Sequence, residues 1–285
     1  MIVFPNCKIN LGLIVRGKRA DGYHDIETVF YPVQVKDVLE IISLPGNPAD
    51  APTTTFTHSG LPVDGDEMDN LCIKAYQLLK KDFPQVPSIK MHLHKAIPMG
   101  AGLGGGSADA AFTLITLNEK YALNLTVEQL LLYALQLGSD CPFFIINNPC
   151  IATGRGETLN PVAVSLAGYQ LVLINPGIHI NTGWAFSQIT IDPDTFAAGT
   201  IANQSLQAII SQPVSEWKNE LKNDFENPVF KRYPEIKAIK DLLYETGAVY
   251  ASMSGSGSSV YGIYKDNIQP TFNFPPKYFV RRILL

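Results

Sequence analysis

The chain has 285 residues, of which 46% are apolar and 17% are charged. This composition supplies enough apolar side chain for a large core, and it excludes a disordered chain or a single small module. The 26 acidic residues outnumber the 22 lysines and arginines, which leaves a formal net charge of -4. Because no overall positive charge would attract phosphate backbones or anionic lipids, we expect neither nucleic acid nor a membrane as a partner.

No stretch approaches the roughly 18 consecutive apolar residues of a membrane-spanning helix. Residues 1–15 lack the basic start and the cleavage site of a signal peptide, so we expect a cytoplasmic protein. The four cysteines show no CxxC spacing and have apolar or proline neighbours, which predicts core residues rather than a zinc site or disulfides. They are Cys7, Cys72, Cys141 and Cys150.

The first part of the chain favours strands. Residues 1–44 alternate apolar and polar side chains, the pattern of strands that bury one face. Residues 45–66 collect Pro, Gly, Thr and Asp, which predicts a long loop with one short strand at 54–58. The spacing of apolar residues then predicts a helix over 70–83 and a strand over 89–93. The chain therefore begins with a mixture of strands and helices.

Two more helices are predicted after a run of glycines. The first covers 107–120 and opens directly out of the run. Thr126 and Gln129 form a capping-box pattern at the start of the second, which is predicted to end at Gly138.

The composition changes near residue 160, where Pro161 and Gly168 flank a short linker. We predict one domain over 1–158 and a second over 159–285, which together make an α+β protein of two lobes. The ending 279–285 fits either a closing strand or a frayed tail. In the second half, the predicted strands cover 169–175, 248–253 and 259–264, and the predicted helices cover 205–210, 214–219 and 235–245.

The segment from Pro98 to Ser107 is the most informative, because it has five glycines between Gly100 and Gly106. Such a run is costly in backbone entropy. Without Cβ atoms, several N–H groups can converge on an anion, and the helix that follows adds the positive end of its dipole. The run therefore predicts a phosphate-binding loop.

A dinucleotide loop, a Walker loop and simple close packing fit this glycine run less well. Gly100, Gly102 and Gly105 satisfy G-x-G-x-x-G, but a dinucleotide fold also needs an acidic residue about 20 positions later at the end of a second strand, whereas Glu119 falls in a helix. A Walker loop ends in G-K-S or G-K-T, and this run has no lysine before Ser107. Close packing of a helix on a strand would not need so long a run.

Several other polar segments fit an ordinary structural role when each is taken alone. Residues 254–259 are a glycine-serine cluster between two predicted strands, either a flexible turn or a second loop that closes on the same nucleotide. Lys8 shares a strand face with Asn10 and could lie on a solvated surface. Asp140 stands where an aspartate commonly caps a turn, and 223–226 could be a polar helix edge.

The joint occurrence of three separated stretches changes this assessment. They are 8–13, 98–108 and 253–260, and in this order they resemble the GHMP kinase superfamily of galacto-, homoserine, mevalonate and phosphomevalonate kinases. The resemblance spans nearly the whole chain. It implies an α+β, two-lobed GHMP kinase fold, with an N-terminal ribosomal-protein-S5-like α/β lobe and a C-terminal ferredoxin-like α+β lobe.

Within the family, 19–24, 138–142 and 223–226 favour the branch that acts on 4-diphosphocytidyl-2-C-methyl-D-erythritol. The resemblance implies ATP-dependent phosphorylation of its 2-hydroxyl, giving the 2-phosphate and ADP, in the methylerythritol phosphate route to isoprenoid precursors. Ser139 stands where the family commonly has a small apolar residue, and 45–66 is poorly matched. The alternatives are another GHMP small-molecule kinase, for homoserine, mevalonate or a sugar, and a binding protein that has lost turnover.

The resemblance also implies site residues. Asn70 and Leu71 are expected near the adenine of ATP, and Mg²⁺ is expected with the nucleotide, with Ser107 as a possible contact and no firm carboxylate ligand. The residues expected to wrap the ATP phosphates are Pro98, Met99, Gly100, Ala101, Gly102, Leu103, Gly104, Gly105, Gly106, Ser107 and Ala108.

For the acceptor, the resemblance implies Asp140 as the base and Lys8 as the cation that keeps Asp140 ionised and favours the charged oxygen of the transition state. Tyr23 and Phe186 are expected to stack on the cytosine, with His24 bonded to its edge. Asn10 and Thr182 are further candidates for substrate contact. The expected partner is this small molecule, bound by a monomer or a homodimer.

Overall fold

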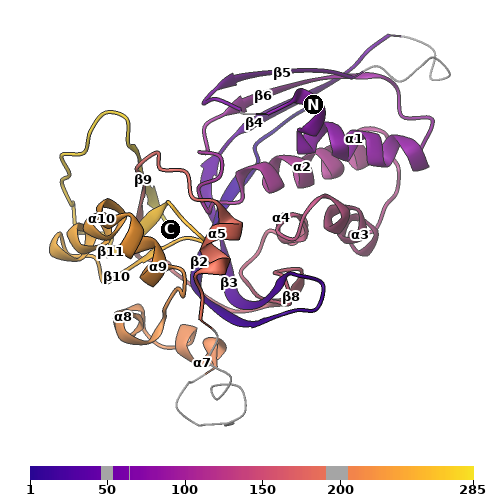
Figure 1. Ribbon diagram of the computed structural model, residues 1–285. Helices are drawn as coiled ribbons and strands as arrows, with labels where there is room; N and C mark the ends of the chain where they lie inside the picture. The colour runs from indigo at the N-terminus through magenta and orange to yellow at the C-terminus, as the bar shows by residue number, and fades with distance from the viewer. Residues whose placement is uncertain (46–53, 64, 191–204) are drawn as a thin grey trace. The chain divides into compact units, whose positions relative to one another are not determined.

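A computed structural model describes residues 1–45, 54–63, 65–190 and 205–285 (Figure 1). The chain forms two compact units, each assembled from separate stretches of sequence. The first contains Met1–Cys7, Gln34–Met99 and Gly104–Asn148, and the second contains Lys8–Val33, Gly100–Leu103 and Pro149–Leu285. Because the chain passes between the units several times, the boundary between residues 158 and 159 stays a prediction.

The first unit is built on a four-stranded sheet, whose strands are β1 (Ile2–Val3), β4 (Val38–Ser43), β5 (Thr54–Gly60) and β6 (Ile89–Lys95). Their order is β1-β4-β6-β5, and β5 runs parallel to β6 while the other neighbours are antiparallel. The strand predicted at 54–58 is confirmed. Within the loop predicted at 45–66, residues 46–53 and residue 64 lie outside the described residues.

The helices of the first unit are η1 (Glu67–Asp69), α1 (Leu71–Asp82), α2 (Gly105–Lys120), α3 (Val127–Leu137) and α4 (Cys141–Ile146). Figure 1 shows α1 and α2 against one face of the sheet. Leu79 and Leu114 of these helices and Met91 of β6 belong to one buried core. The predicted capping box is confirmed, because Thr126 and Gln129 each accept the other's backbone N–H.

The second unit holds two sheets. In the first, with the order β2-β3-β7-β8, the strands are β2 (Asn6–Lys18), β3 (His24–Lys36), β7 (Cys150–Thr153) and β8 (Thr158–Pro161). In the second, with the antiparallel order β10-β11-β9-β12, they are β9 (Tyr169–Asn175), β10 (Tyr250–Met253), β11 (Val260–Lys265) and β12 (Phe279–Leu284). The C-terminal residues are therefore a closing strand, since β12 pairs with β9.

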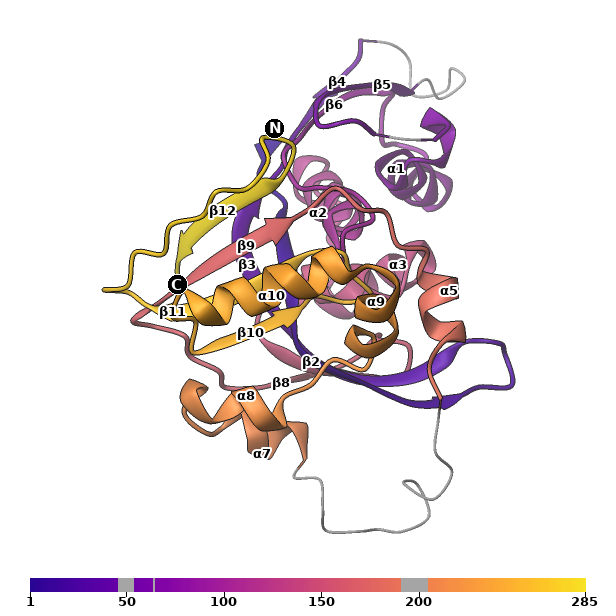
Figure 2. The ribbon, with the colours of Figure 1, turned by 60° about the vertical axis from the view of Figure 1, so that its left-hand side comes forward.

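The helices described in the second unit are α5 (Thr182–Ser187), α7 (Leu206–Ile210), η2 (Val214–Glu216), α8 (Trp217–Glu220), α9 (Glu226–Arg232) and α10 (Pro234–Glu245). Figure 2 shows α10 lying across the sheet of β9, β10 and β11. Ile236, Ile239 and Leu243 of α10 are buried there. The predictions for 205–210, 214–219 and 235–245 are confirmed. The helices α4, α5 and α9 were not predicted from the sequence.

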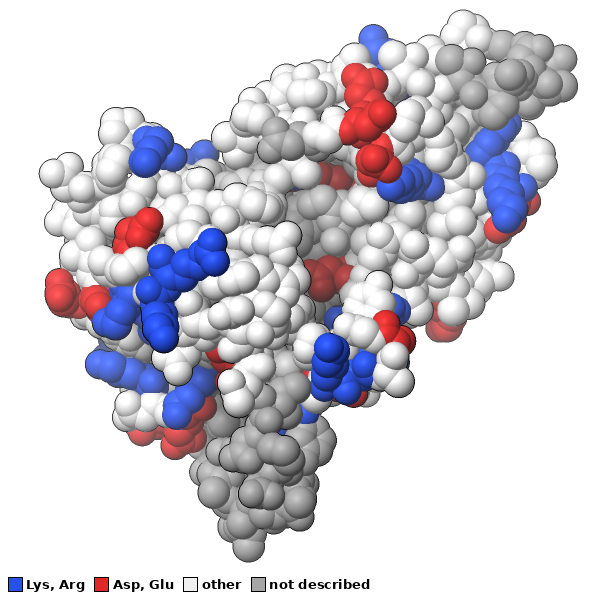
Figure 3. Space-filling view, viewed as in Figure 1, with Lys and Arg blue, Asp and Glu red and all other residues white. Residues whose placement is uncertain are grey.

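All four cysteines are buried and free, as predicted for core residues. Burial raises the pKa of Cys141 and of Cys150 to about 12, so neither thiol is a nucleophile near neutral pH. Within the described part of the chain, none of the helices is both long and apolar enough to cross a membrane. On the face shown in Figure 3, acidic and basic side chains lie in small groups among uncharged residues, which matches the modest net charge.

Candidate active site

The first glycine loop ends where helix α2 begins. Gly104 has a φ of +69°, and its carbonyl accepts the N–H of Ala108, so the helix begins at Gly105 rather than at the predicted Ser107. A Cβ on Gly105 would lie 3.0 Å from Ile97 and 3.2 Å from the Nζ of Lys95, which leaves little room for a side chain. The N–H groups of this first helical turn are the ones that a helix start offers to anions.

The middle of the same loop, Gly100–Leu103, belongs to the second unit. Gly100 and Gly102 have φ angles of +60° and +77°, a conformation that glycine adopts readily. A Cβ on Gly102 would lie 2.0 Å from the carbonyl oxygen of Ser254. Glycine is therefore required at position 102 for two reasons, which are its positive φ angle and the close approach of the Ser254 backbone.

The second glycine cluster packs directly on this middle part. The hydroxyl of Ser254 donates to the carbonyl of Gly102 at 2.8 Å, and the N–H of Ser259 donates to the carbonyl of Ala101 at 3.2 Å. The two glycine segments are therefore joined in this part of the loop by hydrogen bonds between residues about 150 positions apart. That they close on one nucleotide stays a prediction. Residues 254–259 form a turn between β10 and β11, as one alternative predicted, and these hydrogen bonds attach the turn to the first glycine loop.

The side chains of Asn223 and Glu226 hydrogen-bond to the backbone at the start of the second glycine cluster. The Nδ2 of Asn223 donates to the carbonyls of Met253 at 2.8 Å and of Gly255 at 2.9 Å. One oxygen of Glu226 accepts the N–H of Met253 at 2.9 Å. The interpretation of 223–226 as a merely polar helix edge is therefore wrong, because Asn223 is 4% exposed and holds the glycine segment in place.

Lys8 lies inside the second unit with an exposed fraction of 4%, so the solvated-surface alternative is wrong. Its Nζ donates to Oδ1 of Asn10 at 2.7 Å and lies 4.7 Å from the ring centre of Phe30. Its N–H donates to the carbonyl of Leu103 at 3.0 Å, which ties the strand of Lys8 to the first glycine loop. A buried ammonium is favourable only where acceptors surround it, and the Asn10 amide oxygen supplies one here.

Asp140 stands at the N-cap position of α4, as predicted, yet its side chain makes no capping hydrogen bond to the helix. The capping interpretation therefore fails to account for its side chain. Asp140 belongs to the first unit and Lys8 to the second. The functional pairing of these two residues stays a prediction.

The predicted cytidine residues lie in the second unit. His24 and Phe186 stack on each other, with ring centres 4.6 Å apart and planes 15° apart. Burial, with the charge of Lys18, lowers the pKa of His24, so its ring is neutral at pH 7 and can both donate and accept. Tyr23 is 55% exposed beneath the guanidinium of Arg155.

Thr182 begins α5, and its hydroxyl lies 3.1 Å from that of Ser256 in the second glycine cluster. The structure therefore joins one predicted substrate residue to the glycine segments. Asn10 uses both ends of its amide within the protein, and it is 1% exposed. Its predicted contact with substrate stays a prediction.

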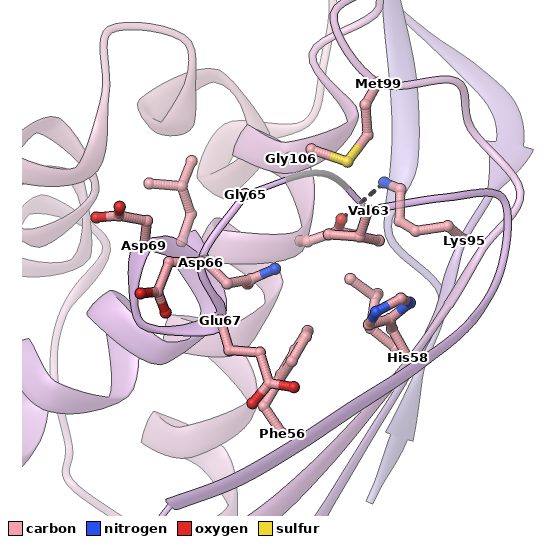
Figure 4. Close-up of a pocket in the computed structure, with 14 residues that line it drawn as sticks. Phe56, His58, Val63, Gly65, Asp66, Glu67, Asp69, Lys95, Met99 and Gly106 are labelled. Carbon is pink, nitrogen blue, oxygen red and sulfur yellow. Dashed lines mark hydrogen bonds and ion pairs between the residues drawn. The ribbon is translucent and has the colours of Figure 1, made fainter.

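A pocket of about 140 Å³ lies in the first unit (Figure 4). Phe56 and His58 of β5, and Lys95 at the end of β6, form one side of it. The structure brings together here four residues predicted for ATP, which are Asn70, Leu71, Met99 and Gly106. The amide oxygen of Asn70 also caps α1 by accepting the N–H of Cys72 at 2.9 Å, so this residue has a local structural role as well.

Two of the residues that line this pocket, Lys95 and Asp109, belong to a buried charge cluster that the sequence did not reveal. Lys95 donates to Asp109 at 2.8 Å and also to Asp37, whose other oxygen accepts the N–H of Ala96 at 2.6 Å. The second oxygen of Asp109 has no hydrogen-bond partner among the described residues. Burial has the largest effect on the pKa of Asp109 and raises it. The charge of Lys95 lowers this pKa and that of Asp37 raises it, so that the pKa of Asp109 is about 7.

Three or more metal-ligating side chains do not come together anywhere in the described ranges. Mg²⁺ bound with a nucleotide commonly takes only one or two protein oxygens beside the phosphates, so a protein cage is not required. The hydroxyl of Ser107, in the first turn of α2, is compatible with such a contact. Its role toward the metal stays a prediction.

Two models of known protein families match the parts of the chain that contain the two glycine segments. Residues 70–148 match the family model of the GHMP kinases N terminal domain, and residues 205–271 match that of the GHMP kinases C terminal domain. The chain belongs to the GHMP kinase family. As a GHMP kinase it is a small-molecule kinase, which confirms the predicted fold and enzyme class.

Curated relatives extend the match to the whole chain. A 4-diphosphocytidyl-2-C-methyl-D-erythritol kinase of Azobacteroides pseudotrichonymphae is 50% identical over 98% of this chain and 100% of its own length. An enzyme of the same name from Bacteroides fragilis is 53% identical over 93% of this chain and 92% of its own length. These two relatives are therefore similar to this GHMP kinase over almost its entire sequence.

One solved structure supports the same family, and a second shares its fold. A crystal structure of 4-(cytidine 5'-diphospho)-2C-methyl-D-erythritol kinase has a TM-score of 0.75, is 30% identical, and covers 92% of this chain and 89% of its own. A homoserine kinase from Cytophaga hutchinsonii has a TM-score of 0.67 at 16% identity, with 92% and 86% covered. The second likeness concerns the fold alone.

Proposed function

We propose that this GHMP kinase transfers the γ-phosphoryl group of ATP to the 2-hydroxyl of 4-diphosphocytidyl-2-C-methyl-D-erythritol, giving the 2-phosphate and ADP. The observation that carries the proposal is the 50–53% identity, over almost the whole chain, to curated kinases named for this substrate. The stacked, neutral His24 and the ring of Phe186 add support, because they offer the flat surface and the hydrogen-bonding edge that a pyrimidine requires.

The reaction asks the protein to position donor and acceptor and to neutralise spreading charge. In our proposal, Asp140 takes the proton of the substrate's 2-hydroxyl. The 2-oxygen bonds to the γ-phosphorus of ATP, and the bond from that phosphorus to the oxygen of the departing ADP breaks. Lys8 lowers the energy of the negative charge on the attacking oxygen. The ammonium of Lys8 is already held by Asn10, so it needs little reorganisation during the reaction.

ATP is assigned by the proposal to the first glycine loop and the pocket beside it. The backbone N–H groups of 99–107, which include the first turn of α2, receive the phosphates. The adenine is assigned to the pocket that contains Asn70 and Leu71, because Met99 and Gly106 of the phosphate loop line the same pocket. Mg²⁺ is proposed to arrive with ATP, where it neutralises phosphate charge.

A coupled assay of ADP release tests the proposal. Purified protein with ATP and Mg²⁺ is offered the cytidyl substrate, homoserine, mevalonate, galactose or methylerythritol without cytidine, each at the same concentration. We expect turnover with the cytidyl substrate alone, and a product that gains one phosphate on the 2-oxygen by phosphorus NMR. Turnover confined to an acceptor without cytidine would replace the proposal with a sibling kinase activity.

A further inference from the structure

Three polar side chains form a buried row on strands β2 and β3 of the second unit. The Nζ of Lys8 donates to Oδ1 of Asn10 at 2.7 Å, and Nδ2 of Asn10 donates to Oγ1 of Thr28 at 2.9 Å. The exposed fractions of the three residues are 4%, 1% and 0%. No motif in the sequence indicates a functional role for Thr28, which lies in β3 between His24 and Phe30.

The hydroxyl of Thr28 can play only one role toward Asn10. It donates its single hydrogen to the carbonyl of Gly12 at 2.5 Å, and a carbonyl can only accept. The oxygen of Thr28 is therefore left as an acceptor, and only the NH₂ end of the Asn10 amide can face it. This arrangement points the amide oxygen at Lys8.

The opposite orientation of the amide would be unfavourable at Lys8. An ammonium has three donors and no acceptor, so a flipped amide would place its NH₂ group against another donor. In a buried site the unmade hydrogen bonds cost roughly 1–3 kcal/mol for each group. The direction of the Asn10 amide thus decides whether Asn10 offers the Lys8 ammonium an acceptor or an opposing donor.

We propose that Thr28 is a positioning residue for phosphoryl transfer, which acts by fixing the Asn10 amide so that it holds the Lys8 ammonium toward the reacting oxygen. The inference rests on the proposed function, because it takes Lys8 to be catalytic. It assigns Asn10 a role as the link between Thr28 and Lys8. Thr28 itself does not need to touch either substrate.

The test is Thr28→Val, which keeps the branched shape and removes the hydroxyl. We expect kcat to fall by roughly 10- to 100-fold, while the KM values for ATP and for the cytidyl substrate change less than about threefold, as for an interaction used in the transition state. Thr28→Ser, which restores a hydroxyl, is expected to recover most of the lost turnover. Turnover is expressed per folded enzyme, with thermal unfolding measured on each variant.

Thr116→Val is a matched control. Thr116 is also fully buried, and its hydroxyl has no hydrogen-bond partner among the described residues, so its removal leaves no polar group unpaired. We expect this variant to keep the kcat of the unaltered enzyme. A general effect of replacing a buried threonine would appear in both variants, whereas loss of positioning would appear only in Thr28→Val.

A double variant separates positioning from structure. If Thr28 acts through Lys8, Thr28→Val adds little to the loss already caused by Lys8→Ala, measured in single turnover. Additive losses, a normal kcat for Thr28→Val, or a Thr28→Ser enzyme as slow as Thr28→Val would each overturn the inference. A normal Lys8→Ala enzyme would instead remove Lys8 from the proposed mechanism, and the two failures are thereby distinguished.

Discussion

Polar side chains are buried around both glycine segments, and each is held by partners distant in the sequence. Asn10 and Asn223 are 1% and 4% exposed, and the side-chain NH₂ group of each donates hydrogen bonds within the protein. A polar group buried in this way is favourable only when its hydrogen bonds are satisfied. The residues that would bind phosphate and acceptor are thereby supported by side chains that need not contact either.

At the scale of single residues, Asp140→Asn tests the proposed base. We expect kcat to fall roughly a thousandfold, since general-base catalysis commonly contributes a factor of that order. The dissociation constant of ATP is expected to change less than about threefold, because the amide keeps the size of the carboxylate. Stopped-flow turnover and calorimetric ATP binding measure the two quantities.

Asp241→Asn, on the exposed side of α10, is the control for Asp140→Asn. Asp241 forms an ion pair with Lys237 one helical turn away, and 49% of its side chain is accessible to solvent. We expect unchanged turnover. An Asp140→Asn enzyme as fast as this control would remove Asp140 from the role of base.

The buried Asp109 predicts a pH-dependent stability. Its pKa of about 7 in the folded protein lies above the ordinary aspartate value of 3.8, so its contribution to stability is complete below about pH 4 and is lost as the pH rises through about 7. The pKa of Lys95 is also raised, because the two carboxylates outweigh burial, but that loss occurs above the ordinary lysine value of 10.5. The pKa of His24 is also shifted, since burial lowers it from its ordinary value of 6.5, so the contribution of Asp109 is isolated by comparison with a variant that keeps His24.

Asp109→Asn isolates this contribution. We expect the free energy of unfolding of the unaltered protein, minus that of the variant, to fall with rising pH between 5 and 8. The slope is at most about 1.4 kcal/mol per pH unit, the value for one proton. Urea unfolding at four pH values measures it, and parallel pH profiles of the two proteins would contradict the raised pKa.

At the scale of elements, the middle of the first glycine loop, Gly100–Leu103, and the second glycine cluster form one structure within the second unit. The middle of the first loop is fixed by Ser254 and Ser259, and the second cluster is fixed in turn by Asn223 and Glu226. Glycine is needed at their contact because the two backbones approach more closely than a Cβ allows. The preformed loop is thus a product of packing rather than of local sequence.

Gly102→Ala tests this close approach, with Gly168→Ala as its control. The two glycines have φ angles of +77° and +82°, but nothing lies within 4 Å of a Cβ on Gly168, whereas one on Gly102 would meet Ser254. We expect Gly102→Ala to destabilise the protein by at least about 2 kcal/mol more than the control, the range of an overpacked core. Its KM for ATP should also rise.

Chemical unfolding of both variants gives the stability difference, and steady-state kinetics gives KM. Both alanines carry the same cost of a positive φ, so their difference measures the clash alone. Equal destabilisation of the two variants would show that the second glycine cluster moves away at little cost.

At the scale of the whole molecule, strands from the N-terminal sequence complete the second unit. Leu13, Val15 and Ile26 belong to the same buried core as Val172 and α10. The N–H of Leu13 donates to the backbone carbonyl of Lys222 at 2.8 Å, and the carbonyl of Leu13 accepts the N–H of Asp224 at 2.9 Å. A second unit made from residues 159–285 alone would expose this core.

We therefore expect the fragment 159–285 to stay unfolded when it is expressed alone. Proton–nitrogen NMR spectra with narrow amide dispersion would report this state. Addition of the fragment 1–158, which supplies the missing strands, is expected to restore dispersed spectra. A folded 159–285 fragment would support the boundary predicted from the sequence and would make the N-terminal strands dispensable for this unit.

The sequence alone determined the features that depend on near neighbours in the chain. The helix over 70–83, the capping box at Thr126 and the strand over 169–175 follow from periodicity and capping chemistry that act within one or two turns. The phosphate-binding character of the glycine run also follows from its composition. The family resemblance located Lys8 and Asp140 through motifs rather than through local physics.

Only the tertiary structure decided which side chains support these motifs. Thr28 orients Asn10, Asn223 anchors the second glycine cluster, and Asp37 joins Lys95 to Asp109, and none of these contacts has a periodic signature. The charge cluster joins residues up to 72 positions apart, from Asp37 to Asp109. Such partners are selected by burial, which requires every polar group to find a hydrogen bond wherever the folded chain brings one within reach.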